Sequence, residues 1–201
     1  MDFSAPASRE SLDAATAALT ANGFTVLVAE NGAEAKEKAL TLIPQGAQVM
    51  TMTSETLKLL GIWTELNDSG KWDSVRARFA TMDKARDHRE MQRLGAAPEW
   101  SVGSVHGVTE DGHVLIASAS GSQLAAHVYG ADHVLFVVGT QKIVPDMATA
   151  ERRLREHTFP LEDARALKAY GEHSSINNVL HIYKPRAGRI TILFVKEAVG
   201  F

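Results

Sequence analysis

Residues 104–145 read SVHGVTEDGHVLIASASGSQLAAHVYGADHVLFVVGTQKIVP, and they show the organisation of the chain most clearly. They predict a strand, an Asp-Gly turn, a strand, a small-residue loop, a helix, a strand and a second loop. Two of these strands end in loops rich in Ser, Thr, Gly, Gln and Lys. Ligands of open α/β sheets bind in the loops beyond the carboxyl ends of strands. We therefore expect this stretch to supply binding loops that the rest of the chain supports.

The pair Asp111-Gly112 between two apolar runs predicts a two-residue hairpin turn, with residue 110 opposite residue 113. In that register His106 and His113 share a face of the hairpin but lie about 13 Å apart along the strands. Two imidazoles at that separation cannot chelate one metal ion. The chain also lacks HExxH spacing, so we expect no metal site.

The first 66 residues alternate between helix and strand. Ser8 and Asn31 are suited to helix N-caps, and Pro44 ends the second helix. This alternation predicts parallel strands joined by right-handed crossovers. The expected helices cover residues 8–22 and 31–43 and begin again at 53–57, and the expected strands cover 24–29 and 48–52.

The later part of the chain predicts more helices and a final pair of strands. Helices are expected over 72–94, 145–157 and 160–170, and β-rich runs over 178–183 and 189–196. Because residues 185–188 read as a turn, we expect those two runs to pair antiparallel at the edge of the sheet, where they would provide a homodimer interface. The whole predicts one α/β domain over residues 1–201, with a mixed, mostly parallel sheet flanked by helices.

The composition narrows the classes of partner. The chain has 201 residues, of which 45% are hydrophobic and 22% charged, and its net charge is -3. This charge gives no electrostatic case for nucleic acid or an anionic membrane. The chain has no apolar run of membrane-spanning length and no basic-then-apolar leader. It also has no Cys, which excludes disulfides, Cys nucleophiles and a self-ligated iron–sulfur cluster. We expect a cytoplasmic protein.

Three polar loops follow predicted strands, at residues 53–56, 118–123 and 139–142. A helix N-terminus with hydroxyl side chains can bind a phosphate or a carboxylate, and so can a Lys just after a buried strand. Ordinary N-caps, a structural turn and a solvent-facing Lys explain the same residues. The candidate ligand-binding residues are Ser54, Thr56, Ser118, Ser120, Gly121, Ser122, Gln123, Gln141 and Lys142.

The chain contains no recognisable catalytic motif. GxGxxG, GxxxxGK[ST] and GxSxG are all absent. A serine of the 118–122 loop would act as a nucleophile only beside a base, for which His106 and His173 are the candidates. The catalytic residues, if the protein is an enzyme, stay unassigned at this stage.

Four segments resemble the LUD-domain family, which includes lactate utilisation protein C and YkgG-like proteins. They are VVGTQKIV (137–144), SETLKLLGI (54–62), VTEDGHVLIASASGSQL (108–124) and PLEDARALKAYGEHSSINNVL (160–180). The last segment is most similar to a compact, stand-alone bacterial branch. The resemblance implies a fold like that of the NagB/RpiA/CoA-transferase superfamily, whose strand-end loops would place Ser54, Thr56, Ser118, Gly121, Ser122, Gln123 and Lys142 in one cleft.

Two functions follow as expectations. The resemblance implies an accessory or ligand-binding component of lactate or organic-acid utilisation, with iron–sulfur oxidoreductases as partners. Because this chain has no Cys, any such cluster would belong to the partner. The polar loops favour the alternative, an enzyme acting on a CoA-linked or phosphorylated small molecule. Both expect a small anionic ligand such as a phosphate, a carboxylate or a CoA-type group.

Overall fold

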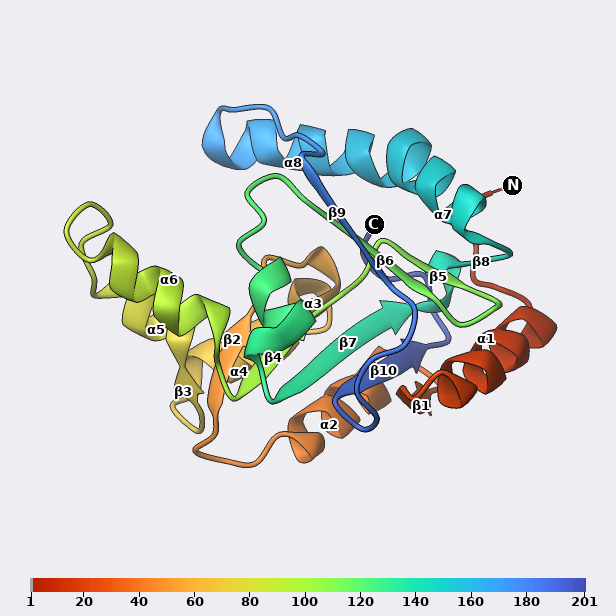
Figure 1. The fold of residues 1–201 in the computed structure, drawn as a ribbon, viewed down its shortest axis with the longest axis horizontal. Coiled ribbons are helices and arrows are strands. Elements are labelled where there is room, and N and C mark those ends of the chain that lie inside the picture. The colour runs from red at the N-terminus through yellow and green to blue at the C-terminus, as the bar shows by residue number, and fades with distance from the viewer. Residues whose placement is uncertain (1) are drawn as a thin grey trace.

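The computed structural model describes residues 2–201 and contains two β-sheets (Figure 1). All neighbouring strands of the larger sheet run parallel, in the order β1 (Thr25–Ala29), β10 (Ile190–Val195), β7 (His133–Gly139), β4 (Trp100–Gly103), β2 (Gln48–Thr51), β3 (Asp73–Ser74). The smaller, mixed sheet has the order β8 (Ile143–Val144), β5 (Gly107–Thr109), β6 (Val114–Ser118), β9 (Asn178–Ile182). The predicted α/β class, with a mostly parallel sheet flanked by helices, is confirmed.

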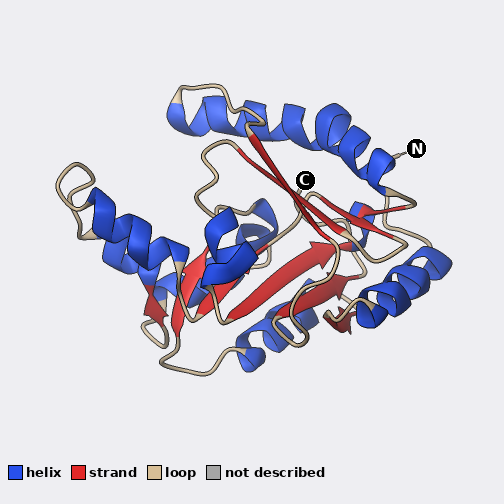
Figure 2. Cartoon of the chain, viewed as in Figure 1, coloured by secondary structure: helices blue, strands red, loops and turns tan. Residues whose placement is uncertain are grey.

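Helices and the smaller sheet cover the two faces of the larger sheet (Figure 2). One face packs its buried apolar side chains against α2, α3 and α4. The other face packs against α1 and the smaller sheet, whose far side packs against α7. The helices are α1 (Arg9–Ala21), α2 (Gly32–Leu42), α3 (Glu55–Leu59), α4 (Ile62–Asp68), α5 (Val75–Ala80), α6 (His88–Ala96), α7 (Met147–Arg153) and α8 (Phe159–Tyr170), with π-helical turns η1 (Ala126–Gly130) and η3 (Leu154–Thr158) and a 3-10 turn η2 (Thr140–Lys142).

Local sequence signals set several helix boundaries. The Ser8 side chain accepts a hydrogen bond from the Ser11 N–H, and that of Asn31 accepts one from the Glu34 N–H, so both predicted N-caps are confirmed. Helix α8 ends at Gly171, whose φ of 74° is the left-handed conformation typical of a helix stop. These boundaries orient the strands that follow.

The predicted antiparallel pairing of the last two strands is wrong. Strand β10 lies between β1 and β7 inside the parallel sheet, whereas β9 pairs with β6 at the edge of the smaller sheet. Every residue of β10 is buried, which is typical of a central parallel strand. The two strands therefore form no common edge, and of the two only β9 lies at the edge of a sheet.

The predicted register of the β5–β6 hairpin is wrong by one residue. Val108 pairs with Val114, and the Thr109 N–H donates to the His113 carbonyl, so three residues rather than two form the turn. A one-residue shift reverses which side chains share a face. His106 and His113 therefore do not share a face. His113 instead contacts Tyr183, with ring centroids 4.7 Å apart.

Three predicted helices have different bounds. The 72–94 segment forms the short strand β3, helix α5, a turn, and helix α6. The helix that starts at residue 53 divides into α3 and α4, because Gly61 adopts a left-handed φ of 65° between them. The helices predicted over 145–157 and 160–170 are joined instead, since η3 connects α7 directly to α8 (Figure 1). Over residues 2–201, no helix has the length and hydropathy needed to cross a bilayer.

Candidate functional site

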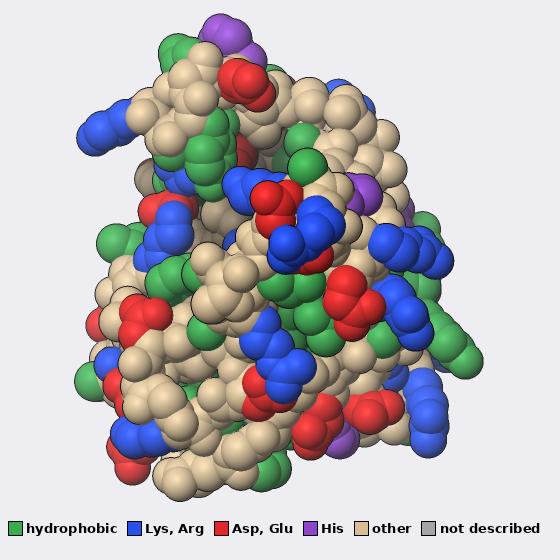
Figure 3. All heavy atoms as spheres, turned by 90° about the vertical axis from the view of Figure 1, so that its left-hand side faces the viewer, with side chains coloured by type: hydrophobic (Ala, Val, Ile, Leu, Met, Phe, Trp, Pro, Cys, Tyr) green, Lys and Arg blue, Asp and Glu red, His purple; other side chains and the backbone are tan. Residues whose placement is uncertain are grey.

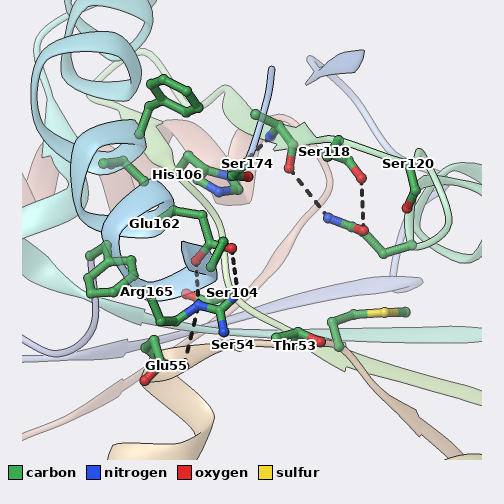
Figure 4. A pocket seen from close by; sticks show the side chains of 18 of the residues that line it. Thr53, Ser54, Glu55, Ser104, His106, Ser118, Ser120, Glu162, Arg165 and Ser174 are labelled. Atoms are coloured by element: carbon green, nitrogen blue, oxygen red, sulfur yellow. Dashed lines mark hydrogen bonds and ion pairs between the residues drawn. The ribbon is translucent and has the colours of Figure 1, made fainter. Parts of the chain in front are cut away.

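A cavity of about 420 Å³ lies at the carboxyl ends of β2 and β4 and just beyond the end of β7 (Figure 4). The smaller sheet and α8 form its other walls, so residues from distant parts of the chain meet here. Binding sites for small molecules commonly have this size. Seven residues predicted from the sequence line the cavity: Ser54, Thr56, Ser118, Ser120, Ser122, Gln123 and Lys142.

Lys142 is buried at the cavity, with only 3% of its surface exposed. It lies in the η2 turn directly after β7. Its Nζ donates to Thr56 Oγ1 at 3.1 Å and to Ser104 Oγ at 3.0 Å. Among residues 2–201 no carboxylate forms an ion pair with it. Burial, and to a smaller extent the charge of Arg153, lower the pKa of the Lys142 amine to about 7.

Arg153 is a second buried cation beside the cavity wall. It is fully buried, and its Nη1 donates to the His106 carbonyl at 2.7 Å and to Thr158 Oγ1 at 2.8 Å. Its Nε and Nη2 have no hydrogen-bond partner in the described chain. Burial lowers the pKa of Arg153 to about 10. Within residues 2–201 neither Lys142 nor Arg153 forms an ion pair, so the charge of Arg153, and that of Lys142 when it is protonated, has no acid bound to it.

His106 lines the cavity as a neutral side chain. Its Nδ1 accepts a hydrogen bond from the Ala117 N–H at 3.0 Å, which leaves the hydrogen of the neutral ring on Nε2. Burial lowers the pKa of His106 to about 3, and the charges of Lys142 and Arg153 act in the same direction. At neutral pH His106 can therefore donate a hydrogen bond from Nε2 and adds no charge.

The 118–123 loop is held by bonds among its own side chains (Figure 4). Ser118 Oγ donates to Gln123 Oε1 at 3.0 Å and accepts from the Gly121 N–H at 2.9 Å. Ser120 Oγ donates to Ser122 Oγ at 3.0 Å. In the described residues none of these hydroxyls donates to a histidine, so the geometry provides no serine nucleophile paired with a base.

Two arginines line the wall of the cavity. Arg165 on α8 is engaged by Glu162, with two N–O distances of 2.7 Å, and lies 3.9 Å from Glu55 (Figure 4). Arg76 on α5 donates to the Thr51 carbonyl at 2.7 Å and forms no ion pair with any residue from 2 to 201. Burial lowers the pKa of Arg76. Arg165 is thus neutralised by acids, whereas Arg76 keeps an uncompensated charge.

Two predicted site residues do not line the cavity. Gly121 bends the loop with a φ of 77° beside Asn178. The Gln141 side chain points to the C-terminal segment, where its Nε2 donates to the carbonyls of Val199 and Gly200. Both residues support the site rather than face it.

The sequence predictions missed Ser104, Arg76 and Arg153. Ser104 follows β4, a strand that the sequence did not predict, and residue 104 was expected at the start of a strand instead. The two arginines lie among other charged helix residues, and nothing in their local sequence separates them from solvent-facing ones. The sequence indicates His106 only as a metal ligand or a base, not as a neutral hydrogen-bond donor.

In the part of the chain that the structure describes, no three His, Asp or Glu side chains are grouped to hold a metal ion. Figure 3 shows acidic and basic side chains interspersed on the side where α5 and α6 lie. That face therefore shows no large patch of a single charge.

Comparison with known proteins identifies the family. The sequence profile of the LUD domain matches residues 12–195. The chain belongs to the LUD-domain family. A crystal structure of a DUF162 family protein from Deinococcus radiodurans is similar, with a TM-score of 0.57 and 12% sequence identity over 94% of this chain and 99% of that chain. No curated protein matches. At this identity the structural likeness shows a shared LUD-domain fold and nothing about the ligand.

Proposed function

We propose that this LUD-domain protein is a ligand-binding component of lactate or related organic-acid utilisation, and that its cavity holds a small organic anion. One observation carries the proposal: Lys142 is buried at the cavity without an acidic partner, and the charge of Arg153 lies behind it. An unpaired buried charge costs several kcal/mol, which an anion in contact with Lys142 would offset. Membership of the LUD-domain family supports the link to lactate.

A thermal-shift screen tests whether the cavity binds such an anion. Lactate, other 2-hydroxy acids, 2-oxo acids and sugar phosphates would each be added to the full chain. A ligand at 100 times its Kd stabilises the folded protein by about 2.7 kcal/mol. We expect at least one carboxylate to raise the melting temperature in a saturable way. Lys142→Met should lose this rise, and Lys84→Met, a control change at an exposed residue, should keep it. Equal shifts in both variants would contradict the proposal.

The hydroxyl-lined wall beside Arg76 favours a second candidate, an enzyme acting on a phosphorylated or CoA-linked molecule. Thr53 Oγ1 accepts from Arg76 Nη2 at 3.2 Å, and Ser54 lines the same wall. Hydroxyls next to an arginine suit a phosphate. If sugar phosphates or CoA esters alone shift the melting temperature, the second candidate replaces the first.

The resemblance to the LUD-domain family supports an iron–sulfur oxidoreductase as a partner in the proposed organic-acid oxidation. This chain has no Cys to ligate a cluster, so the cluster would belong to that partner. Deletion of the gene in a strain without paralogues should slow growth on lactate, and the tagged protein should co-purify with a cluster-containing oxidoreductase. Growth on lactate at the wild-type rate would count against the role in lactate use, while leaving anion binding to be decided by the screen.

A further inference from the structure

We propose that Lys142 forms an imine with the carbonyl group of a small oxo compound that also carries a carboxylate or a phosphate. The inference rests on the proposed function in one respect, since the cavity must admit a small organic anion. It goes further in assigning covalent chemistry to one nitrogen atom. Three features of the described residues carry it: the hydrogen bonds of Nζ, the charges around Nζ, and the position of Arg76.

The hydrogen bonds of Nζ suit a neutral amine. Thr56 Oγ1 lies 3.2 Å from the Val199 carbonyl, to which it donates its one hydrogen, so it accepts from Lys142. Ser104 Oγ provides the second acceptor. Two acceptors match the two hydrogens of a neutral amine, and the lone pair is then left unused by any group of residues 2–201. An ammonium would instead have a third N–H without a protein acceptor.

The surrounding charges also disfavour the ammonium. Arg153 lies behind Lys142, and His106 on the neighbouring wall is neutral. Three acids line the cavity: Glu55 and Glu162 face Arg165, and Glu172 is exposed. With a pKa of about 7, Lys142 has on the order of 10³ times the neutral fraction of an ordinary lysine at pH 7. Desolvation in a cavity is a known route to nucleophilic lysines.

The chemical step requires no further reactant. The lone pair of Nζ attacks the carbonyl carbon, a C–N bond forms, and the carbonyl oxygen gains a proton that the nitrogen loses, giving a carbinolamine. The C–O bond then breaks, the oxygen leaves as water after taking a second proton from the nitrogen, and a neutral C=N bond remains. Nothing is oxidised or reduced. One water molecule is released for each imine formed.

Arg76 defines the other end of the substrate. Its guanidinium lines the same cavity and forms no ion pair within residues 2–201. A planar guanidinium can donate two parallel hydrogen bonds to a carboxylate or a phosphate. The substrate class is therefore a small carbonyl compound with one anionic end, such as a 2-oxo acid or a phosphorylated ketone.

Reductive trapping tests the inference on the full chain. Pyruvate and dihydroxyacetone phosphate would be incubated with the protein at mildly alkaline pH, borohydride added, and the labelled peptide identified by mass spectrometry. Lactate and glycerol 3-phosphate are matched controls, because they have the same anionic ends without the carbonyl. We expect one reduced adduct per chain at Lys142, absent with both controls. Pyruvate alone giving the adduct would assign a 2-oxo acid, and the phosphate alone a phosphorylated ketone.

Variants and a parallel binding measurement separate the outcomes. The adduct should be lost in Lys142→Arg and unchanged in Lys84→Arg. If Lys142→Arg fails to fold, the position of the adduct in the wild-type peptide map still decides the test. Labelling spread over exposed lysines, or no labelling, overturns the inference. If pyruvate and lactate then raise the melting temperature equally, anion binding stands and only imine formation fails. If neither does, both proposals fail for these ligands.

Discussion

Lys142 is the residue on which both proposals depend. Its position just after a buried strand could be predicted from the sequence, and so could its suitability for an anion. The burial of Lys142 could not be predicted, because it depends on the smaller sheet and the C-terminal segment, which cover this residue. The sequence predicted the wrong partner for β9, a strand of that smaller sheet. A lysine in a polar turn looks the same in sequence whether it faces solvent or a cavity.

Replacing Lys142 with Met should change how stability depends on pH. The folded state lowers the pKa of Lys142 from 10.5 to about 7, so between these values the unfolded chain binds the extra proton. The wild type should therefore gain stability as pH rises from 7 towards 10.5, by at most about 1.4 kcal/mol per pH unit. Urea unfolding at a series of pH values measures this gain, which Lys142→Met should lack and Lys84→Met should keep. Parallel pH profiles for wild type and Lys142→Met would refute the desolvated amine.

The buried histidines should limit stability in acid. Burial lowers the pKa of both His106 and His127 to about 3, so the unfolded chain binds more protons between pH 6.5 and 3. Stability should fall as pH drops below 6.5, by several kcal/mol in total. His127→Gln should remove about half of that dependence on pH, if the two histidines contribute equally. His88→Gln, at an exposed position, is the control for unfolding followed by circular dichroism. An unchanged acid slope in His127→Gln would exclude this cause.

The sequence predicts correctly that β5 and β6 form a hairpin, but it predicts their pairing register one residue off. Asp111-Gly112 correctly predicted a turn between two strands. The extra turn residue is required because Gly112, with a φ of 83°, lies against α1, and the Asn22 side chain donates to its carbonyl. Contacts between a turn and a distant helix are not encoded near the turn.

Gly112→Ala should destabilise the protein more than Gly46→Ala. Both glycines have φ near 82°, so both variants incur the same backbone strain of about 1 kcal/mol. A Cβ at Gly112 would lie 2.5 Å from the backbone of Ala18, whereas one at Gly46 meets no atom within 4 Å. Overpacking adds about 1–3 kcal/mol. Equal unfolding free energies for the two variants, measured in urea, would show that the turn can move away from α1.

The last two strands show where a local pattern misleads. A turn between two apolar runs predicted an antiparallel pair, but the runs differ in a way the sequence does show. Strand β10 reads ITILFV and is buried on both faces, whereas β9 reads NVLHI and is half-exposed. Continuous apolar runs favour central parallel strands. The continuous apolar run of β10 therefore indicates its central position in the parallel sheet more reliably than the turn before it indicates an antiparallel pair.

At the scale of the whole molecule, the cavity brings together segments that are far apart in sequence. Thr56, Ser118 and Lys142 were predicted to meet because each follows a strand or opens a helix, and they line one cavity. Arg76 lines the cavity and Arg153 lies beside its wall, and the sequences of the helices that carry them show no sign of this. Strand-end loops are thus predictable as a group, whereas charges supplied by flanking helices depend on how the layers pack.

Titration calorimetry with lactate measures whether this electropositive cavity takes up an organic anion. Above pH 7 an anion beside Lys142 favours the ammonium, so binding should take up as much as one proton, seen as a heat that varies with the buffer's ionisation enthalpy. We predict saturable binding of lactate by the wild type and by Lys84→Met. Lys142→Met should bind lactate at least tenfold more weakly, a loss of about 1.4 kcal/mol in binding free energy. Lactate binding of equal strength in Lys142→Met, with no proton uptake in the wild type, would contradict the assignment of this cavity as the anion site.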